Sequence, residues 1–369
     1  MKQPISIRLM RRLINLNVYR AIFGAIVLTA VGCQQSSPPP VSQPVSPPVS
    51  QPVQPATTAA VSKTVDAPSL AVATKFPYEV TDGLGRKVIL AKIPLRIVSL
   101  SPKNTEMLFA VGAGDQTVGT TTYCNYPPAA AKIEKVGGFS AKSLSLERIV
   151  SLKPDLVLSV GDLHVPIIQE LERLEIPVVA FSADSFEGLF KDLQLLGRMT
   201  GHEGEASTLV NKLIERVDRV KEKAQTIPDK ERLTAMYYVW GDPLTGAGPI
   251  SYFGEMIQFC GAVNIVEDTS TRFPKLTMEV LLTKNPDVII SSTNHSDLIS
   301  PKVVDSRPGW GRLKAVQEKR VYLLDGGLVS RCTPRTVDAL ELMAHLVYPT
   351  YFAAPREESK SDHANGPQR

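Results

Sequence analysis

Short apolar runs alternate with amphipathic segments along most of the chain, from Phe76 to about Tyr348. The short runs fit buried strands, and the longer segments, with apolar residues three and four positions apart, fit helices. Strands that alternate with helices predict parallel sheets with right-handed crossovers, and hence an α/β fold. The predicted strands are 96–100, 117–120, 156–160, 178–181, 233–240, 288–292 and 321–324, after a hairpin at 78–80 and 87–90. The predicted helices are 104–111, 146–152, 165–174, 186–200, 252–260 and 336–347.

One further predicted helix is much longer and separates two similar halves. Residues 203–226 place Leu213, Val217 and Val220 at helical spacing with charged residues between them, and Pro228 follows. An amphipathic helix of this length would span about 36 Å, enough to cross from one domain to another. Because the alternation of strands and helices restarts after it, the pattern predicts two lobes joined by one helix.

A short motif occurs once in each half. Glu147 stands seven residues before Pro154-Asp155 and an apolar strand, and Glu279 repeats this arrangement 132 residues later. An acid in the first turn of a helix is also favoured by the helix dipole. That preference does not require the same spacing twice, so we expect the two glutamates to share a role.

The first residues have the pattern of an export signal. Residues 1–33 combine five basic and no acidic side chains with the apolar run 21–32, which ends at Cys33. As a helix this run is about 18 Å long, short of a bilayer core of roughly 30 Å, which favours a cleaved signal over a spanning anchor. The end of the run is similar to the bacterial lipoprotein signal, although Ala30 stands where leucine is usual. We predict that Cys33 is lipidated; an ordinary secretory signal is the alternative.

Proline is concentrated just after this signal. Eight of the 29 prolines fall between Pro38 and Pro55. Chain of this composition is extended and semi-rigid, so we predict a disordered tether that holds a folded body away from a membrane. The predicted organisation is a signal at 1–33, the tether at 34–75, an N-terminal lobe at 76–202, a connecting helix at 203–226, a C-terminal lobe at 227–352 and a disordered tail at 353–369.

Composition narrows the possible function classes. The net charge is +4 and the basic residues are scattered, so no nucleic-acid partner is expected. Four cysteines and five histidines lack metal-ligand spacing, and we expect neither a metal site nor a resident cofactor. The nucleophile-elbow, P-loop and dinucleotide-binding glycine signatures are also missing. We therefore assign no catalytic residue and favour a binding function over an enzyme.

Five motifs follow one another along the body: RIVSLSPKNTE at 96–106, YCNYPP at 123–128, VGGF at 136–139, LERIVSLKPD at 146–155 and CGAVNI at 260–265. Together they resemble the substrate-binding proteins of ABC importers for cobalamin and iron-siderophores, and most closely the cobalamin-binding members. The resemblance implies two Rossmann-like lobes with parallel sheets, joined by a single long helix, with the ligand in the cleft between them. A stiff connecting helix implies limited closure when the ligand binds.

The resemblance also implies cleft residues. Aromatic rings suit large flat ligands because stacking adds about 1 kcal/mol per ring. Arg331 is implied to meet an anionic group of the ligand, and Arg335 to pair or cap structurally, whereas Val160 replaces a further tryptophan of the cobalamin binders. Packing in the core or at the rim is the alternative for each aromatic residue. The four aromatic residues at matching positions are Tyr123, Phe139, Trp240 and Phe273.

In this family one surface glutamate of each lobe docks onto arginines of the membrane permease. The matching positions are Glu147 and Glu279. The implied partner is therefore a permease dimer. The two glutamates, one on each lobe, would contact the two halves of this dimer. Charge-assisted pairs of this kind set orientation more than affinity.

These features predict an exported, monomeric protein that is anchored to the membrane through Cys33 and faces the periplasm or the cell exterior. It would capture cobalamin or a related corrinoid and deliver it to an importer. A ferric siderophore or haem is the alternative ligand, which Tyr123 and Arg331 would suit. A zinc or manganese binder of the other helix-linked importer family is disfavoured by the few histidines.

Disulfide pairing stays open at this point. Cys260 occupies a position that is bonded in some relatives, but the partner position near Ala344 is not cysteine. Cys124 or Cys332 could take its place, and an exported compartment would permit a bond. The spacing of the cysteines does not choose a pair.

Overall fold

The computed structural model describes residues 74–355, apart from 269, 296–298, 300–303 and 305. All of these residues belong to one compact unit. The predicted export signal, Cys33 and nearly all of the predicted tether and tail lie outside the described residues. Within the described part, no helix has both the length and the apolar character needed to cross a bilayer.

The N-terminal lobe contains a four-stranded parallel sheet in the order β4-β3-β5-β6. Its strands are apolar because side chains pack against both faces of the sheet, as parallel sheets require. The strands are β3 (Ile97–Ser99), β4 (Thr117–Gly119), β5 (Leu156–Val160) and β6 (Val178–Phe181), after an antiparallel hairpin of β1 (Tyr78–Thr81) and β2 (Lys87–Leu90). The helices of this lobe are α1 (Pro102–Ala110), α2 (Leu146–Ser151) and α3 (Val165–Arg173).

The C-terminal lobe contains a five-stranded sheet in the order β11-β10-β7-β8, with β9 also paired to β7. All its pairs are parallel except that of β7 and β8, which the sequence pattern did not predict because the Asp242-Pro243 turn interrupts the apolar run. The strands are β7 (Thr234–Gly241), β8 (Leu244–Gly246), β9 (Val263–Asn264), β10 (Val288–Ser292) and β11 (Val321–Leu324). The helices are α6 (Tyr252–Phe259), α7 (Met278–Lys284), α10 (Lys314–Gln317), α11 (Gly326–Val329) and α12 (Thr336–Val347).

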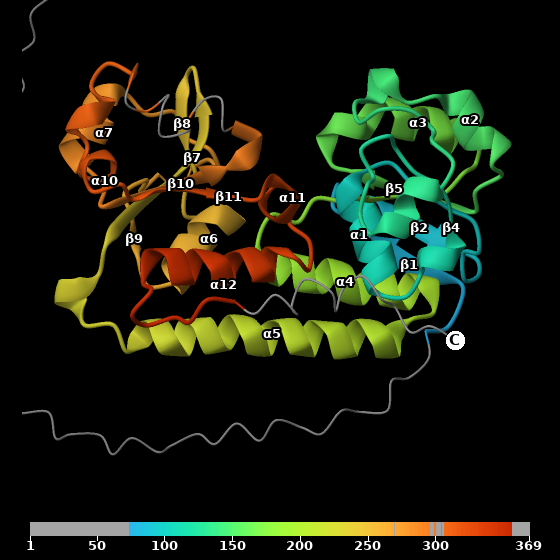
Figure 1. Cartoon of the computed structure of the whole chain (residues 1–369). Coiled ribbons are helices and arrows are strands. Elements are labelled where there is room, and N and C mark those ends of the chain that lie inside the picture. Colours follow the sequence, from blue (N-terminus) through green and yellow to red (C-terminus); the bar gives the residue numbers. More distant parts are fainter. Residues whose placement is uncertain (1–73, 269, 296–298, 300–303, 305, 356–369) are drawn as a thin grey trace, which may run out of the picture. The chain divides into compact units, whose positions relative to one another are not determined.

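One long helix, at residues 203–225, connects the lobes (Figure 1). α4 (Phe186–Thr200) ends at Gly201, whose φ of 78° lies in the left-handed region that glycine tolerates, and α5 (Glu203–Gln225) turns back beside it. The apolar stripe of α5 packs on α4, α6 and α12 (Figure 1). Arg216 of α5 also donates to Asp338 and Glu341 of α12, each at 2.6 Å.

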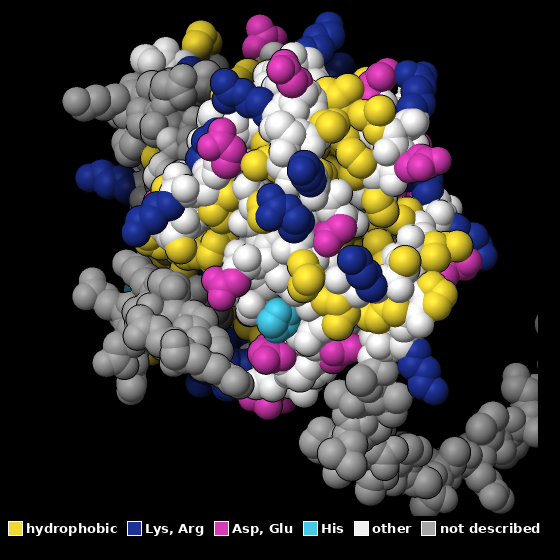
Figure 2. All heavy atoms as spheres, turned by 90° about the vertical axis from the view of Figure 1, so that its right-hand side faces the viewer, with side chains coloured by type: hydrophobic (Ala, Val, Ile, Leu, Met, Phe, Trp, Pro, Cys, Tyr) yellow, Lys and Arg dark blue, Asp and Glu magenta, His cyan; other side chains and the backbone are white. Residues whose placement is uncertain are grey.

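One apolar core runs through both lobes. It includes Leu108 and Leu193 on the N-terminal side, Leu213 of α5, and Met256 and Leu340 on the C-terminal side. Two smaller clusters fill the outer layers of the lobes. On the outer face of the N-terminal lobe, acidic and basic side chains are interspersed with apolar ones (Figure 2). The parallel sheets and the long helix confirm the predicted α/β class.

Candidate functional site

A cavity of about 770 Å³ opens between the two lobes. Its lining comes largely from the ends of β3, β4, β5, β6, β10 and β11, or from the segments that follow them. These are the carboxyl ends of parallel strands, where open α/β sheets bind their ligands. The lining residues are Ser101, Pro102, Lys103, Tyr123, Phe139, Val160, Ala183, Asp184, Tyr252, Phe253, Arg272, Phe273, Asn294, Ser330, Arg331 and Cys332.

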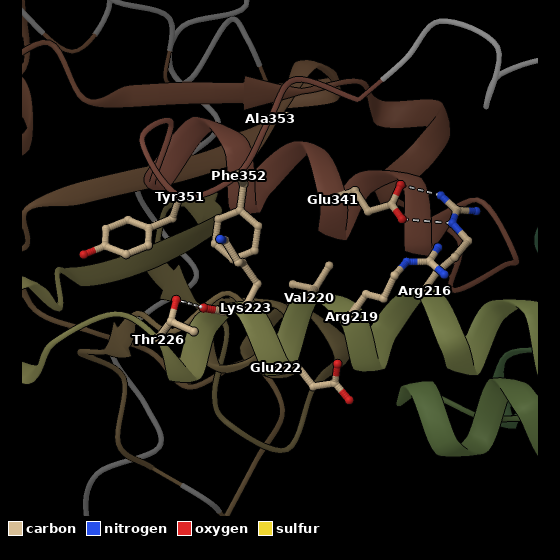
Figure 3. Close-up of a pocket in the computed structure, with 10 residues that line it drawn as sticks. All are labelled: Arg216, Arg219, Val220, Glu222, Lys223, Thr226, Glu341, Tyr351, Phe352 and Ala353. Atoms are coloured by element: carbon tan, nitrogen blue, oxygen red, sulfur yellow. Dashed lines mark hydrogen bonds and ion pairs between the residues drawn. The ribbon is translucent and has the colours of Figure 1, made fainter.

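A second cavity, of about 660 Å³, lies between α5 and the segment that follows α12 (Figure 3). Half of its ten lining residues are charged, and Arg216 in its wall already pairs with Glu341 and Asp338. It has no strand end in its wall. Ligand sites combine a largely apolar lining with a few placed polar groups, so the interlobe cavity is the better candidate.

The structure brings four of the five predicted ligand contacts to the interlobe cavity: Tyr123, Phe139, Phe273 and Arg331. The three rings are exposed, Tyr123 most of all at 59%. Trp240 is not among the lining residues. It lies at the end of β7, where its Nε1 donates to the carbonyl of Asp242 at 3.2 Å, and its ligand contact stays a prediction.

A buried histidine supports the N-terminal wall of the cavity. Nε2 of His164 lies 2.7 Å from the carbonyl oxygen of Phe139, and the two rings meet edge to face at 5.8 Å. Burial lowers the pKa of His164, while the bond to Phe139 opposes this shift. The neutral ring therefore donates from Nε2 and accepts the N–H of Val160 at Nδ1, which ties both lining residues to one side chain.

Two aromatic residues of the cavity were not among the predicted ligand contacts, because the sequence placed them only in a predicted helix. Tyr252 and Phe253 open α6, and their ring centroids lie 4.0 Å apart. Phe253 also stacks on Tyr237 at 4.0 Å and approaches Phe273 at 6.2 Å. The available signal was the helix start at Ser251, whose side chain caps α6 and orients its first turn. The C-terminal side of the cavity is thus an aromatic cluster.

Each cationic residue of the lining has an acidic partner. Lys103 lies 3.1 Å from Asp192 and also donates to the carbonyl of Ala183, and Arg272 lies 3.3 Å from Asp184. Burial raises the pKa of both aspartates, and the adjacent Lys103 and Arg272 pull each pKa back down. The third cation, Arg331, pairs with Glu106 at 2.6 Å.

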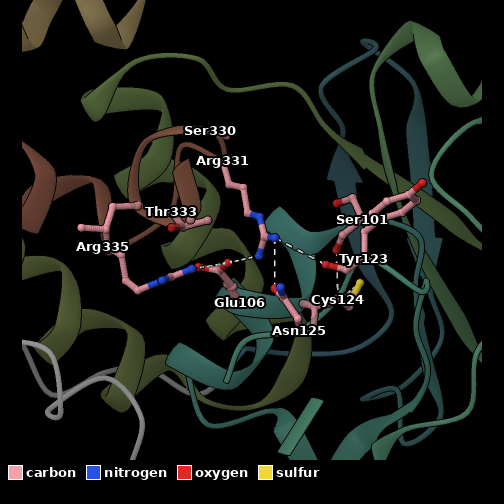
Figure 4. A network of polar contacts seen from close by, with 12 residues as sticks. Ser101, Glu106, Tyr123, Cys124, Asn125, Ser330, Arg331, Thr333 and Arg335 are labelled. Carbon is pink, nitrogen blue, oxygen red and sulfur yellow. Dashed lines mark hydrogen bonds and ion pairs between the residues drawn. The ribbon is translucent and has the colours of Figure 1, made fainter. Parts of the chain in front are cut away.

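The Glu106 carboxylate joins the lobes across the cleft (Figure 4). Its side chain is 3% exposed and accepts from Arg331 at 2.6 Å and from Arg335 at 2.7 and 3.0 Å. Arg331 also donates to Oδ1 of Asn125 at 3.0 Å, and the Arg335 guanidinium stacks 3.7 Å from the Tyr126 ring centroid. Arg335 thus lies in a structural pair, as expected, whereas Arg331 faces the cavity with its charge already engaged.

The two glutamates of the repeated motif occupy equivalent positions. Glu147 lies in the first turn of α2 behind the cap Ser145, and Glu279 in the first turn of α7 behind the cap Thr277. Both are exposed. Among the described residues, neither glutamate has an ion pair or a side-chain hydrogen bond, so no side-chain contact accounts for either carboxylate.

The Pro-Asp part of the same motif does have a structural role. Asp155 accepts the backbone N–H groups of Leu95 and Arg96 at 2.9 and 2.8 Å, just before β3. Asp287 accepts the N–H of Thr234 at 2.8 Å, at the start of β7. In each lobe the aspartate therefore fixes the beginning of the neighbouring strand, which separates its role from that of the glutamate.

The cysteines beyond Cys33 are buried free thiols: Cys124, Cys260 and Cys332. None of the pairings left open by the sequence is formed among them. Burial raises the pKa of Cys260 and Cys332 to about 12 in each case, so both thiols are uncharged at neutral pH. A search of the described residues finds no group of three histidine, cysteine, aspartate or glutamate side chains arranged to hold a metal ion.

The sequence and fold match known proteins over the whole two-lobed body. The family described as periplasmic binding protein matches residues 97–328. An uncharacterized ABC transporter substrate-binding lipoprotein of Bacillus subtilis, YvrC, is 34% identical over 282 residues, which covers 75% of this chain and 87% of the relative. A cobalamin-binding protein of Halobacterium salinarum is 28% identical over 284 residues, 75% of this chain and 76% of the relative.

A solved structure supports the same arrangement. A possible iron-binding (periplasmic solute-binding) protein from Staphylococcus epidermidis superposes with a TM-score of 0.62 at 27% identity. The match covers 70% of this chain and 100% of the other chain.

Proposed function

Because the chain belongs to the periplasmic binding protein family, as a substrate-binding protein of an ABC importer, we propose that it captures cobalamin or a related corrinoid and delivers it to a membrane permease. This family consists of solute-binding proteins, which confirms the expectation that the chain is not an enzyme. Membership of the family does not determine which ligand is bound or how it is delivered, so these two points are the proposal.

The observation that carries the corrinoid proposal is the distribution of rings around the interlobe cavity. Tyr123 and Phe139 come from the N-terminal lobe, and Phe253 and Phe273 from the C-terminal lobe. A corrin is broad and flat with apolar faces, so rings on both sides of a cleft can hold it by stacking and area burial. The relative named a cobalamin-binding protein supports the same choice.

A ferric siderophore or haem is the second candidate. The phenol of Tyr123 is exposed in the cavity, and a tyrosine oxygen is an established type of iron ligand in haem proteins. The Staphylococcus epidermidis protein, which is described as a possible iron-binding protein, also favours this ligand class. In the corrinoid proposal Tyr123 acts through its ring, so removal of its hydroxyl distinguishes the two candidates.

For delivery, the proposed contacts with a permease dimer are Glu147 and Glu279. Their equivalent positions, their exposure and their lack of partners in the described fold all support a role toward another protein. The proposed anchor is Cys33, which lies outside the described residues. The name of the Bacillus subtilis relative, a lipoprotein, supports the anchor and an extracytoplasmic location.

The test is calorimetric titration of the purified protein with cyanocobalamin, a ferric trihydroxamate and hemin. We expect a single cyanocobalamin site of sub-micromolar affinity, which the double variant Tyr123→Ala/Phe273→Ala weakens. Ile89→Ala is the matched control, since Ile89 is an exposed apolar residue of β2 and does not line the cavity. Binding of hemin or the trihydroxamate without cyanocobalamin would overturn the corrinoid choice, and loss of hemin binding in Tyr123→Phe would indicate that the Tyr123 oxygen is an iron ligand.

A further inference from the structure

The charged groups of the interlobe cavity form a balanced set. Among the residues that the structure describes, all three cationic residues of the lining are paired with carboxylates of the same chain. The pairs are Lys103 with Asp192, Arg272 with Asp184, and Arg331 with Glu106, at 3.1, 3.3 and 2.6 Å. Asp184 is itself part of the lining, whereas Glu106 and Asp192 lie directly behind it.

Two of these pairs are largely removed from water. The side chains of Lys103 and Asp192 are 12% and 15% exposed, and those of Arg331 and Glu106 are 17% and 3% exposed. Separation of a buried pair leaves an uncompensated charge in a medium that solvates it poorly. The Arg272 pair is different, because the Arg272 side chain is 52% exposed.

The groups next to this set preserve the balance. Arg335 adds a positive charge at Glu106. Glu255 adds a negative charge next to Phe186, whose backbone N–H it accepts at 2.7 Å. The thiol of Cys332 and the phenol of Tyr252, which also line the cavity, have raised pKa values because they are buried, and both are neutral at pH 7.

From this arrangement we infer that the cavity selects a ligand without net charge, an inference that rests on the proposed function of the cavity as the ligand site. An anionic ligand that paired with Arg331 or Lys103 would have to displace Glu106 or Asp192, each of which would then stay buried without its full compensation. A cationic ligand that paired with one of the carboxylates would likewise leave a buried lysine or arginine without its partner. The paired charges thus act against charged competitors, while the rings supply attraction for a neutral one.

The experiment compares ligands of different charge on the full protein. Cyanocobalamin and a ferric trihydroxamate are the neutral probes, and a ferric tris-catecholate is the trianionic probe. The tris-catecholate is expected to bind at least about 100-fold more weakly than the better neutral probe, a ratio of about 2.7 kcal/mol. Affinity for the neutral probe is expected to be nearly independent of salt, because no net charge is neutralised on binding.

A variant that uncovers one cation provides the internal test. Glu106→Gln keeps the shape of the side chain but removes the charge that compensates Arg331, and it should raise tris-catecholate affinity about tenfold or more, as one charge at short range predicts. Asp192→Asn does the same for Lys103 and covers the case in which Glu106→Gln does not fold. Glu79→Gln is the matched control, because it removes the charge of Glu79, an exposed residue of β1 that pairs with Lys87 of β2.

The outcomes separate this inference from the corrinoid proposal. If the neutral trihydroxamate binds and cyanocobalamin does not, the corrinoid proposal fails and the selection for a neutral ligand stands. If the tris-catecholate binds as tightly as the neutral probes, with an affinity that falls steeply with salt, the inference is wrong whichever neutral probe binds. Equal tris-catecholate affinities in wild type, Glu106→Gln and Asp192→Asn would also overturn it.

Discussion

Arg335, at the start of α12, donates two hydrogen bonds to Glu106 of α1, at 2.7 and 3.0 Å, and so connects the two lobes directly. The carboxylate is almost completely buried, and the guanidinium is held from its other side by the Tyr126 ring. A contact of this type stabilises the observed arrangement of the lobes, and Arg335 itself does not line the cavity.

Replacement of Arg335 by methionine should lower the free energy of unfolding by about 2 kcal/mol. The apolar part of the side chain is retained, but the buried Glu106 loses two charge-assisted hydrogen bonds and keeps only Arg331. Urea unfolding followed by circular dichroism measures the change. Lys87→Met, which breaks the exposed pair with Glu79, should leave the midpoint unchanged; equal effects of the two variants would contradict the buried role of Arg335.

Protonation of His164 should destabilise the folded protein as the pH drops through 6.5. Burial lowers the pKa of His164 below its ordinary value of 6.5. The unfolded chain therefore binds a proton at this position at a higher pH than the folded chain does, and protonation favours unfolding. Urea titrations between pH 8 and pH 5 should show a smaller pH dependence for His164→Gln. If the free energy of unfolding of His164→Gln depends on pH as strongly as that of wild type, His164 does not contribute to the pH dependence.

Charge reversal at Glu147 or Glu279 should leave ligand affinity intact and abolish uptake. Both carboxylates are exposed and lie outside the cavity lining, so the reversal acts only on a partner. Uptake in cells and calorimetry on the purified variants measure the two effects separately. Glu170→Lys, an exposed change on α3, serves as the control and should still support uptake. A loss of ligand affinity in Glu147→Lys or Glu279→Lys would contradict permease docking.

Removal of the Phe273 ring should weaken ligand binding about fivefold, which corresponds to the roughly 1 kcal/mol of one stacked ring. Trp240→Ala should have a smaller effect, because Trp240 does not line the cavity. Calorimetry with the ligand that binds wild type gives both values. A larger loss for Trp240→Ala would show that this side chain reaches the ligand from the β7–β8 hairpin.

Substitution of Cys33 by alanine should move the protein from the membrane fraction to the soluble fraction. The predicted thioether-linked lipid is the only anchor proposed, and the described part of the chain has no helix suited to span a bilayer. Fractionation followed by immunoblotting measures the distribution. Retention of Cys33→Ala in the membrane fraction would exclude lipidation at this position as the anchor.

The sequence predicted the framework well because the strands of a parallel sheet are buried on both faces. The run Leu156–Val160 is apolar over nearly its whole length for this reason, and β5 has these bounds in the structure. Tyr123 and Phe139 could be placed at the cavity because their motifs follow predicted strands and match those of the family. α1 starts at Pro102, two residues before the predicted helix, because proline fits the first turn and Ser101 caps it.

Other parts of the site depend on contacts that no local pattern contains. Arg331 and Glu106 are 225 positions apart, and nothing near either residue indicates that they pair. Tyr252 and Phe253 lie in a predicted helix, and only the packing of α6 shows that they face the cavity. The neutralisation of Arg331 follows from this long-range pairing, and it changes the expected role of that residue.

The continuous apolar core has a consequence for how this protein can be modified. Leu193, Leu213 and Leu340 belong to different segments of the chain but to one packed interior. A lobe separated from the rest would therefore expose a broad apolar surface to water and lose some of the packing contacts that stabilise it. Single side chains at the rim of the cavity should therefore be exchangeable with those of a relative. Transplantation of a whole lobe would instead disrupt the apolar core that stabilises both halves.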